Sequence, residues 1–203
     1  MLLKLIKDGG PMMWVILVLD MIALAVILKK VFQFHREEIH VRELLRGLFN
    51  VLRREGFVEA VSLCDNTPGP VARMLSAAIA AKQQNEDIRS AIDDAAFNEI
   101  PRLERGVRLL GTIGFILPLV GFLGTVIGML QAFEVVRAEE FLSTSAISGA
   151  VTCALITSAA GLAGAIPCYV AYNYLVSRID AITLEMDRAA LEIISFFERS
   201  SKK

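Results

Sequence analysis

The sequence contains long stretches without a single charged residue, which is unusual for a soluble domain. Among its 203 residues, no Asp, Glu, Lys or Arg occurs between Leu109 and Phe133 or between Phe141 and Ser177. These uncharged runs of 25 and 37 residues exceed the roughly 20 apolar residues that a helix needs to cross a bilayer. Hydrophobic residues make up 55% of the chain, above the roughly 45–50% typical of soluble domains. A cytosolic enzyme is therefore disfavoured.

Residues that signal disulfide, metal or nucleic-acid chemistry are scarce. The cysteines Cys64, Cys153 and Cys168 form no disulfide framework, and small packing residues are the simplest interpretation of all three. Cys153 and Cys168 lie about 22 Å apart on one predicted helix, too far for a disulfide within a chain. The net charge of −1 shows no basic excess for nucleic acid, and no phosphate loop, nucleophile elbow or metal motif occurs. We therefore expect no enzyme activity, no cofactor and no metal.

A third apolar stretch runs from Gly9 to Leu28 and is interrupted only by Asp20. A cleavable signal peptide is the alternative, but no small-x-small cleavage site follows this stretch, so we favour a membrane anchor. The sequence thus predicts an all-α integral membrane protein with spans at 11–31, 106–133 and 146–176.

Basic residues gather on one side of these spans. Residues 29–108 contain 13 Lys and Arg, whereas the 134–145 loop contains one Arg and three Glu. Because short basic segments stay in the cytoplasm, we expect 32–105 and 177–203 on that side. The segment 1–10 and the 134–145 loop are then expected outside, which is the periplasm in an organism with two membranes.

The expected cytoplasmic segments have helical periodicity. A helix over VRELLRGLFNVLRREG is predicted to end at Gly56, and after NTPGP the next helix begins with Pro70 in its first turn. Pro101 is expected to kink or restart the helix that leads into the second span. In the tail, apolar residues recur at steps of three and four: Ile179, Ile182, Met186, Ala189, Ile193 and Phe197. We therefore expect the third span to continue without a break, and the other helices to pack on such extensions.

Small residues form one face of each of the last two spans. In the second span this face comprises Gly114, Pro118, Gly121, Thr125, Gly128 and Ala132. In the third span it comprises Ala154, Ser158, Gly161, Ala165, Cys168 and Tyr172. Close helix packing is the favoured interpretation, because small residues let backbones approach. Alternatively, the two faces line a polar path through the membrane, with Thr125, Thr157 and Ser158 as its hydroxyl groups.

Asp20 is the one ionisable residue inside a predicted span. A lone carboxylate near mid-membrane costs roughly 3 kcal/mol or more and marks either a function or a buried pairing. The structural alternatives are a neutral Asp20 bonded to a neighbouring helix, or a small shift of the span that brings it to the interface.

Two segments joined by a short loop resemble the signature of the MotA/TolQ/ExbB proton-channel family: TIGFILPLVGFLGTVIGMLQAF and ALITSAAGLAGAIPCYVAYN. The leader PRLERGVRLLGTIG matches as well, and three spans with a large first cytoplasmic segment suit the ExbB and TolQ branch. The resemblance implies a multi-pass protein of the bacterial inner membrane, in contact with lipid. It also implies a homopentamer around two copies of a single-span partner of the ExbD or TolR type.

The resemblance further implies a mechanism. An aspartate in the partner's span exchanges protons with the pentamer, and the motion drives outer-membrane transport or envelope work, through a TonB- or TolA-like protein. H⁺ is the favoured ion and Na⁺ the alternative. Thr125 matches the threonine that faces this aspartate, and Ser158 replaces a second threonine. Pro118, Pro167 and Asn173 match the family's prolines and closing asparagine.

One position departs from the family pattern, because Cys153 stands where ExbB and TolQ usually have a glutamate. We favour the explanation that the partner aspartate, Thr125 and Ser158 suffice for a proton path. The competing explanation is that Asp20 supplies the compensating acid, which requires Asp20 to face the pore. A membrane scaffold of the same fold that has lost conduction is the alternative function.

Overall fold

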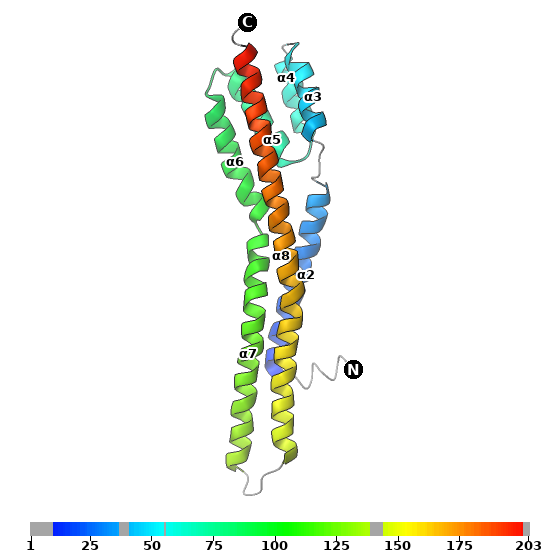
Figure 1. The fold of residues 1–203 in the computed structure, drawn as a ribbon, viewed down its shortest axis with the longest axis vertical. Helices are drawn as coiled ribbons and strands as arrows, with labels where there is room; N and C mark the ends of the chain where they lie inside the picture. Colours follow the sequence, from blue (N-terminus) through cyan, green and yellow to red (C-terminus); the bar gives the residue numbers. More distant parts are fainter. Residues whose placement is uncertain (1–9, 37–40, 55, 139–143, 201–203) are drawn as a thin grey trace. The chain divides into compact units, whose positions relative to one another are not determined.

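The structure, a computed structural model, describes residues 10–36, 41–54, 56–138 and 144–200, most of which are helical (Figure 1). No strand occurs within these ranges. Three helical stretches are long and apolar enough to cross a membrane: Gly10–Phe34, Ile88–Glu134 and Ser148–Arg199. The prediction of an all-α protein with three apolar helices is confirmed for this part of the chain. Residues 1–9 and 139–143, which belong to the segments expected outside, are not among the described residues.

The chain divides into two compact units. The span unit comprises Met1–Lys29 and Gly106–Tyr174, and the bundle unit comprises Lys30–Arg105 and Leu175–Lys203.

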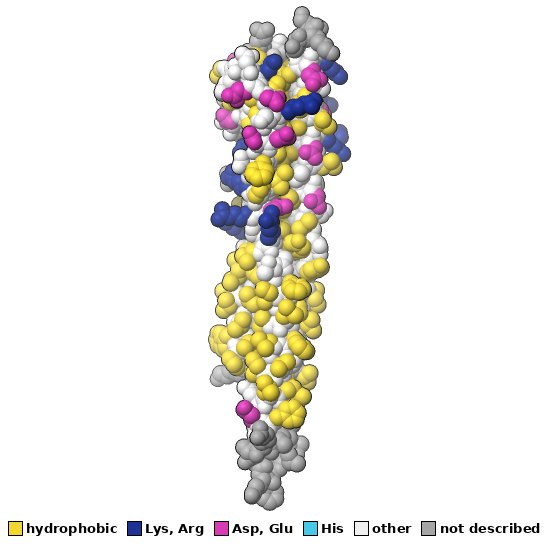
Figure 2. Space-filling model, turned by 90° about the vertical axis from the view of Figure 1, so that its left-hand side faces the viewer, with side chains coloured by type: hydrophobic (Ala, Val, Ile, Leu, Met, Phe, Trp, Pro, Cys, Tyr) yellow, Lys and Arg dark blue, Asp and Glu magenta, His cyan; other side chains and the backbone are white. Residues whose placement is uncertain are grey.

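The span unit contains most of α2 (Gly10–Arg36), all of α7 (Val107–Ala138) and the first part of α8 (Thr144–Ser200). Many of its large apolar side chains point outward: Phe115 and Phe122 are 69% and 67% exposed. Figure 2 shows hydrophobic side chains over the face of this unit that is turned to the viewer. Lipid tails are as apolar as these side chains, so such a surface suits a hydrocarbon environment.

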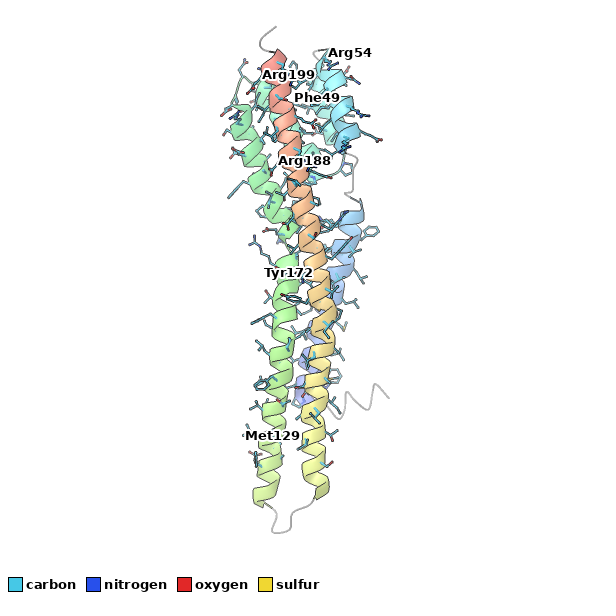
Figure 3. All side chains as sticks on the ribbon, viewed as in Figure 1. Phe49, Arg54, Met129, Tyr172, Arg188 and Arg199 are labelled. Carbon is cyan, nitrogen blue, oxygen red and sulfur yellow. The ribbon has the colours of Figure 1, made fainter. Side chains whose placement is uncertain are left out.

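The bundle unit packs α3 (Val41–Leu52), α4 (Phe57–Asp65), α5 (Pro70–Gln83) and α6 (Ile88–Glu104) with the C-terminal part of α8. Fully buried residues from α3, α5 and α8, including Leu48, Leu75 and Ile193, form one apolar core. Phe49, labelled in Figure 3, stacks on Phe196 with ring centroids 5.0 Å apart. The predictions that α8 is unbroken and that the shorter helices pack on it are confirmed.

The helix restart that the sequence predicts at Pro101 occurs instead at Gly106. Pro101 lies in the last part of α6 with its ring exposed, and the Arg105 N–H still donates to its carbonyl oxygen at 3.0 Å. Gly106 adopts a φ of +90°, which interrupts the helix and which glycine tolerates at little cost. The predicted restart was wrong because a proline near a helix end removes only one hydrogen bond, whereas the positive φ that separates α6 from α7 is one that glycine adopts readily. A kink at Pro101 stays a prediction.

Candidate functional site

Helices α7 and α8 of the span unit approach each other closely through glycines on both sides. A Cβ atom at Gly121 would lie 3.1 Å from the carbonyl oxygen of Thr157. At Gly161 a Cβ would lie 2.6 Å from the carbonyl oxygen of Leu117, closer than real Cβ atoms come. The two small-residue faces therefore pack against each other within one chain, as glycine-rich faces in membranes allow.

Most of the small residues selected from the sequence are buried in the span unit. Gly114, Gly121, Gly128, Gly161 and Ala165 are buried, Pro118 is half-buried and Pro167 is exposed. A Cβ at Gly128 would lie 2.9 Å from the Cβ of Ala154. Gly111 also belongs to this contact, although it was not predicted: a Cβ there would lie 2.8 Å from the ring of Tyr172, which extends towards α7 (Figure 3). The sequence contains a signal for this contact, because Gly111 precedes Gly114 by three residues and so extends the same small-residue face of the helix.

Two hydroxyl groups of α8 lie at the contact with α7. The Ser158 Oγ donates a hydrogen bond across the interface to the carbonyl oxygen of Gly121, at 3.1 Å. The Thr157 side chain is buried, and its Oγ1 lies 2.9 Å from the carbonyl oxygen of Ala154 in its own helix. Gly124 makes room for this hydroxyl, since a Cβ there would lie 2.5 Å from Oγ1.

Thr125 of α7 is half-buried within the chain. Its Oγ1 donates to the carbonyl oxygen of Phe122 in the preceding turn, at 2.6 Å. A hydroxyl that donates in this way keeps its lone pairs as acceptors. Thr125 can therefore accept a hydrogen bond from a group outside the chain, which the buried Thr157 cannot.

Asp20 and Cys153 both lie along the contact of α2 with α8, but they are not brought together. The Asp20 carboxylate lies against Gly164, where a Cβ would overlap it. The Cys153 Sγ lies near the start of α2, 3.3 Å from the position of a Cβ on Gly10. Gly164 follows Cys153 by 11 residues, about 16 Å along α8. Asp20 therefore lies at a different position along α8 from Cys153, the residue that stands where a glutamate was expected.

The chemistry of the α7–α8 interface follows from its side chains. Serine and threonine hydroxyls donate and accept hydrogen bonds but carry no charge near neutral pH. No charged residue occurs between Leu109 and Phe133 or between Phe141 and Ser177, so this interface holds no carboxylate. Among the described residues, no group of His, Cys, Asp or Glu is placed to hold a metal ion. A proton path along these hydroxyls needs an acid from another helix or another chain.

More than half of the chain matches one protein family. Residues 66–188 match the model of the MotA/TolQ/ExbB proton channel family, a match that covers more than half of the chain, including all of α7. The chain belongs to this family. The resemblance noted in the sequence is thereby confirmed, and with three apolar helices the protein is a multi-pass membrane member of it.

Curated relatives carry names from the ExbB and TolQ branch. The biopolymer transport protein ExbB of Xanthomonas campestris pv. campestris is 34% identical over 119 residues, 59% of this chain and 47% of the relative. The Tol-Pal system protein TolQ of Haemophilus influenzae is 31% identical over 128 residues, 59% of this chain and 56% of the relative. A putative ExbB-like protein of Synechocystis sp. is 30% identical over 175 residues, 83% of this chain and 68% of the relative. The chain spans about half the length of the first two relatives.

Proposed function

We propose that this chain is the proton-conducting subunit of an inner-membrane energy-transducing complex of the ExbB/TolQ type. The observation that carries the proposal is the match of residues 66–188 to a proton channel family, over the segment that contains α7 and the hydroxyls of α8. The role is that of a channel subunit and not of an enzyme.

The proposed path uses Thr125 as the hydroxyl that meets a carboxylate from outside the chain. That carboxylate belongs to a single-span partner of the ExbD or TolR type, because the uncharged stretches 109–133 and 141–177 contain none. Protonation of the partner carboxylate removes a charge from the membrane and permits a step of motion. Ser158 bonds α8 to Gly121 of α7 and Thr157 packs against Gly124, so both hold the two helices together beside Thr125. The path needs no further acid at the position where Cys153 stands in place of a glutamate.

The proposed assembly is a homopentamer that surrounds two partner copies. The N-terminus is periplasmic and the C-terminus cytoplasmic, in agreement with the 13 basic residues between 29 and 108. A TonB- or TolA-like protein transmits the motion to outer-membrane transport or envelope work. The driving ion is H⁺, with Na⁺ as the alternative that an ion-replacement experiment distinguishes.

The proposal is tested by proton flux into liposomes that contain the chain co-purified with its single-span partner. We expect Thr125→Ala to lower the flux about tenfold, equivalent to roughly 1.4 kcal/mol of barrier, and Thr125→Ser to retain most of it. Thr152→Ala is the matched control, because that exposed hydroxyl donates only to the Ser148 carbonyl of its own helix. Unchanged flux in Thr125→Ala would remove the central residue of the path. Absence of flux in the intact wild-type complex would favour the non-conducting scaffold, with Cys153 as its reason.

A further inference from the structure

A cleft between α2 and α8 of the span unit holds the carboxyl group of Asp20. Small residues of α8 line it, among them Ala160, Ala163 and Gly164. No Lys, Arg or His occurs among the described residues that line the cleft, so no cation balances a carboxylate there. Cys168 is the only other titratable group in this lining. The proton path proposed above makes no use of this cleft.

The carboxyl group of Asp20 rests directly on the backbone of α8. A Cβ at Gly164 would overlap one carboxylate oxygen and lie 2.8 Å from Cγ and from the second oxygen. Only glycine leaves this space free. The half-buried acid is therefore placed against a stretch of α8 backbone.

The same stretch of α8 contains a carbonyl group that lacks its helical donor. Pro167 lies inside α8 and has no N–H, so the carbonyl oxygen of Ala163, four residues earlier, receives no hydrogen bond from it. Ala163 lines the cleft and directly precedes Gly164. In a hydrocarbon environment such a freed carbonyl needs another donor, which a side chain of a neighbouring helix can supply.

We propose that Asp20, as a neutral carboxylic acid, donates a hydrogen bond to the carbonyl oxygen of Ala163 and so fastens α2 to α8. The bond satisfies both polar groups at once: the acid keeps its proton and avoids an unpaired charge in the membrane, and the carbonyl gains the donor that Pro167 lacks. Asp20 is thus a proton-holding positioning residue, separate from the path through Thr125. This inference does not depend on conduction.

Substitutions at both ends of the bond distinguish it from simple packing. Asp20→Asn keeps an N–H donor of similar shape, whereas Asp20→Leu fills the space without a donor. Pro167→Ala restores the N–H that the Ala163 carbonyl lacks, which makes the donor from Asp20 redundant. Asp20→Leu should therefore lower the midpoint of thermal unfolding in the wild-type background and lower it much less in the Pro167→Ala background.

The experiment uses the full chain in lipid nanodiscs and combines this double-mutant cycle with infrared spectroscopy at neutral pH. In the wild-type chain we expect the infrared absorption band of a hydrogen-bonded neutral carboxylic acid. This band should be lost in Asp20→Asn. In Pro167→Ala it should shift to the frequency of a more weakly hydrogen-bonded acid. Asp180→Asn, which removes an exposed carboxylate of α8, is the matched control and should leave the absorption unchanged. Absence of the neutral-acid absorption, or an equal effect of Asp20→Leu in both backgrounds, overturns the proposal. Should Asp20→Leu fail to fold, Asp20→Asn and the absorption of the wild-type chain still decide it.

Discussion

Gly161 of α8 lies directly against Leu117 of α7, such that a Cβ on Gly161 would stand 2.6 Å from the Leu117 carbonyl oxygen. Ser158, three residues earlier in α8, donates a hydrogen bond to the carbonyl oxygen of Gly121 in α7. Both contacts hold α7 and α8 close together at the level of Thr157 and Ser158.

Gly161→Ala should separate the two helices locally. The added methyl group meets a backbone carbonyl that cannot rotate away, so we expect a loss of about 1–3 kcal/mol in the free energy of unfolding. The measurement is the midpoint of thermal unfolding of the detergent-solubilised chain. Gly149→Ala is the control in the same helix, because a Cβ there meets nothing within 4 Å. Equal midpoints for the two variants would contradict the close approach at Gly161.

Ser158→Ala should remove one hydrogen bond between helices without changing their spacing. Such bonds in membranes contribute roughly 0.6 kcal/mol on average and at most about 1.7 kcal/mol, so the expected loss of stability lies in that range. The same unfolding assay measures it. The hydroxyl of Thr183, which donates to its own helix at Ile179, provides the comparison, and Thr183→Ala should have the smaller effect. A larger effect at Thr183 would contradict the interhelical role of Ser158.

An ion pair joins α5 and α6 in the bundle unit. Arg73 donates to both carboxylate oxygens of Glu99 at 2.8 and 2.7 Å, and the Glu99 side chain is only 12% exposed. Arg73→Leu leaves this carboxylate without its main partner, and we expect a loss of about 2 kcal/mol in chemical unfolding. Arg89→Leu breaks the exposed contact with Glu198 at 3.8 Å and should change stability by less than about 0.5 kcal/mol. Similar losses for both variants would contradict this ranking.

Cys64 should be chemically inert in the folded protein. Burial, and then the neighbouring Asp65 carboxylate, raises the pKa of the Cys64 thiol from 9.0 to about 11. At pH 8 we expect no alkylation of Cys64 by iodoacetamide until the protein is denatured, measured by peptide mapping. Ser62→Cys, an exposed position two residues earlier, should be alkylated rapidly under the same conditions. Rapid alkylation of folded Cys64 would contradict the burial.

The same thiol has a consequence for stability at alkaline pH. The unfolded thiol ionises near pH 9, whereas the folded thiol remains protonated until about pH 11. The unfolded state therefore loses its proton first, and the contribution of Cys64 to stability falls as the pH rises through this interval. Cys64→Ala should reduce the loss of stability between these two pH values.

Much of the fold follows from sequence patterns that are local. The uncharged runs predict the long apolar helices, and NTPGP with Pro70 predicts the break before α5. The restart at Gly106 is harder to predict, because a proline three residues before the end of α6 is the stronger local signal. The Arg73–Glu99 pair cannot be found from the sequence, since its partners lie 26 residues apart and meet only when α5 packs on α6.

The candidate site is predictable in part. The steps of three and four identify the small faces of α7 and α8, because glycine-rich faces pack together in membranes. The position of α2 does not follow from that pattern. Small residues continue around α8 through Ala160, Ala163 and Gly164, so the sequence alone offers more than one surface on which α2 could pack. The contact of Asp20 with Gly164 selects one of them.

In the proposed function the chain conducts protons together with a carboxylate that it does not itself supply at the α7–α8 interface. The most direct test is proton flux in liposomes with the chain alone, with its single-span partner, and with a partner whose transmembrane aspartate is replaced by asparagine. We expect flux only in the complex with the intact aspartate. Equal flux through the chain alone, or flux unaffected by the partner substitution, would contradict a proton path that depends on the partner carboxylate.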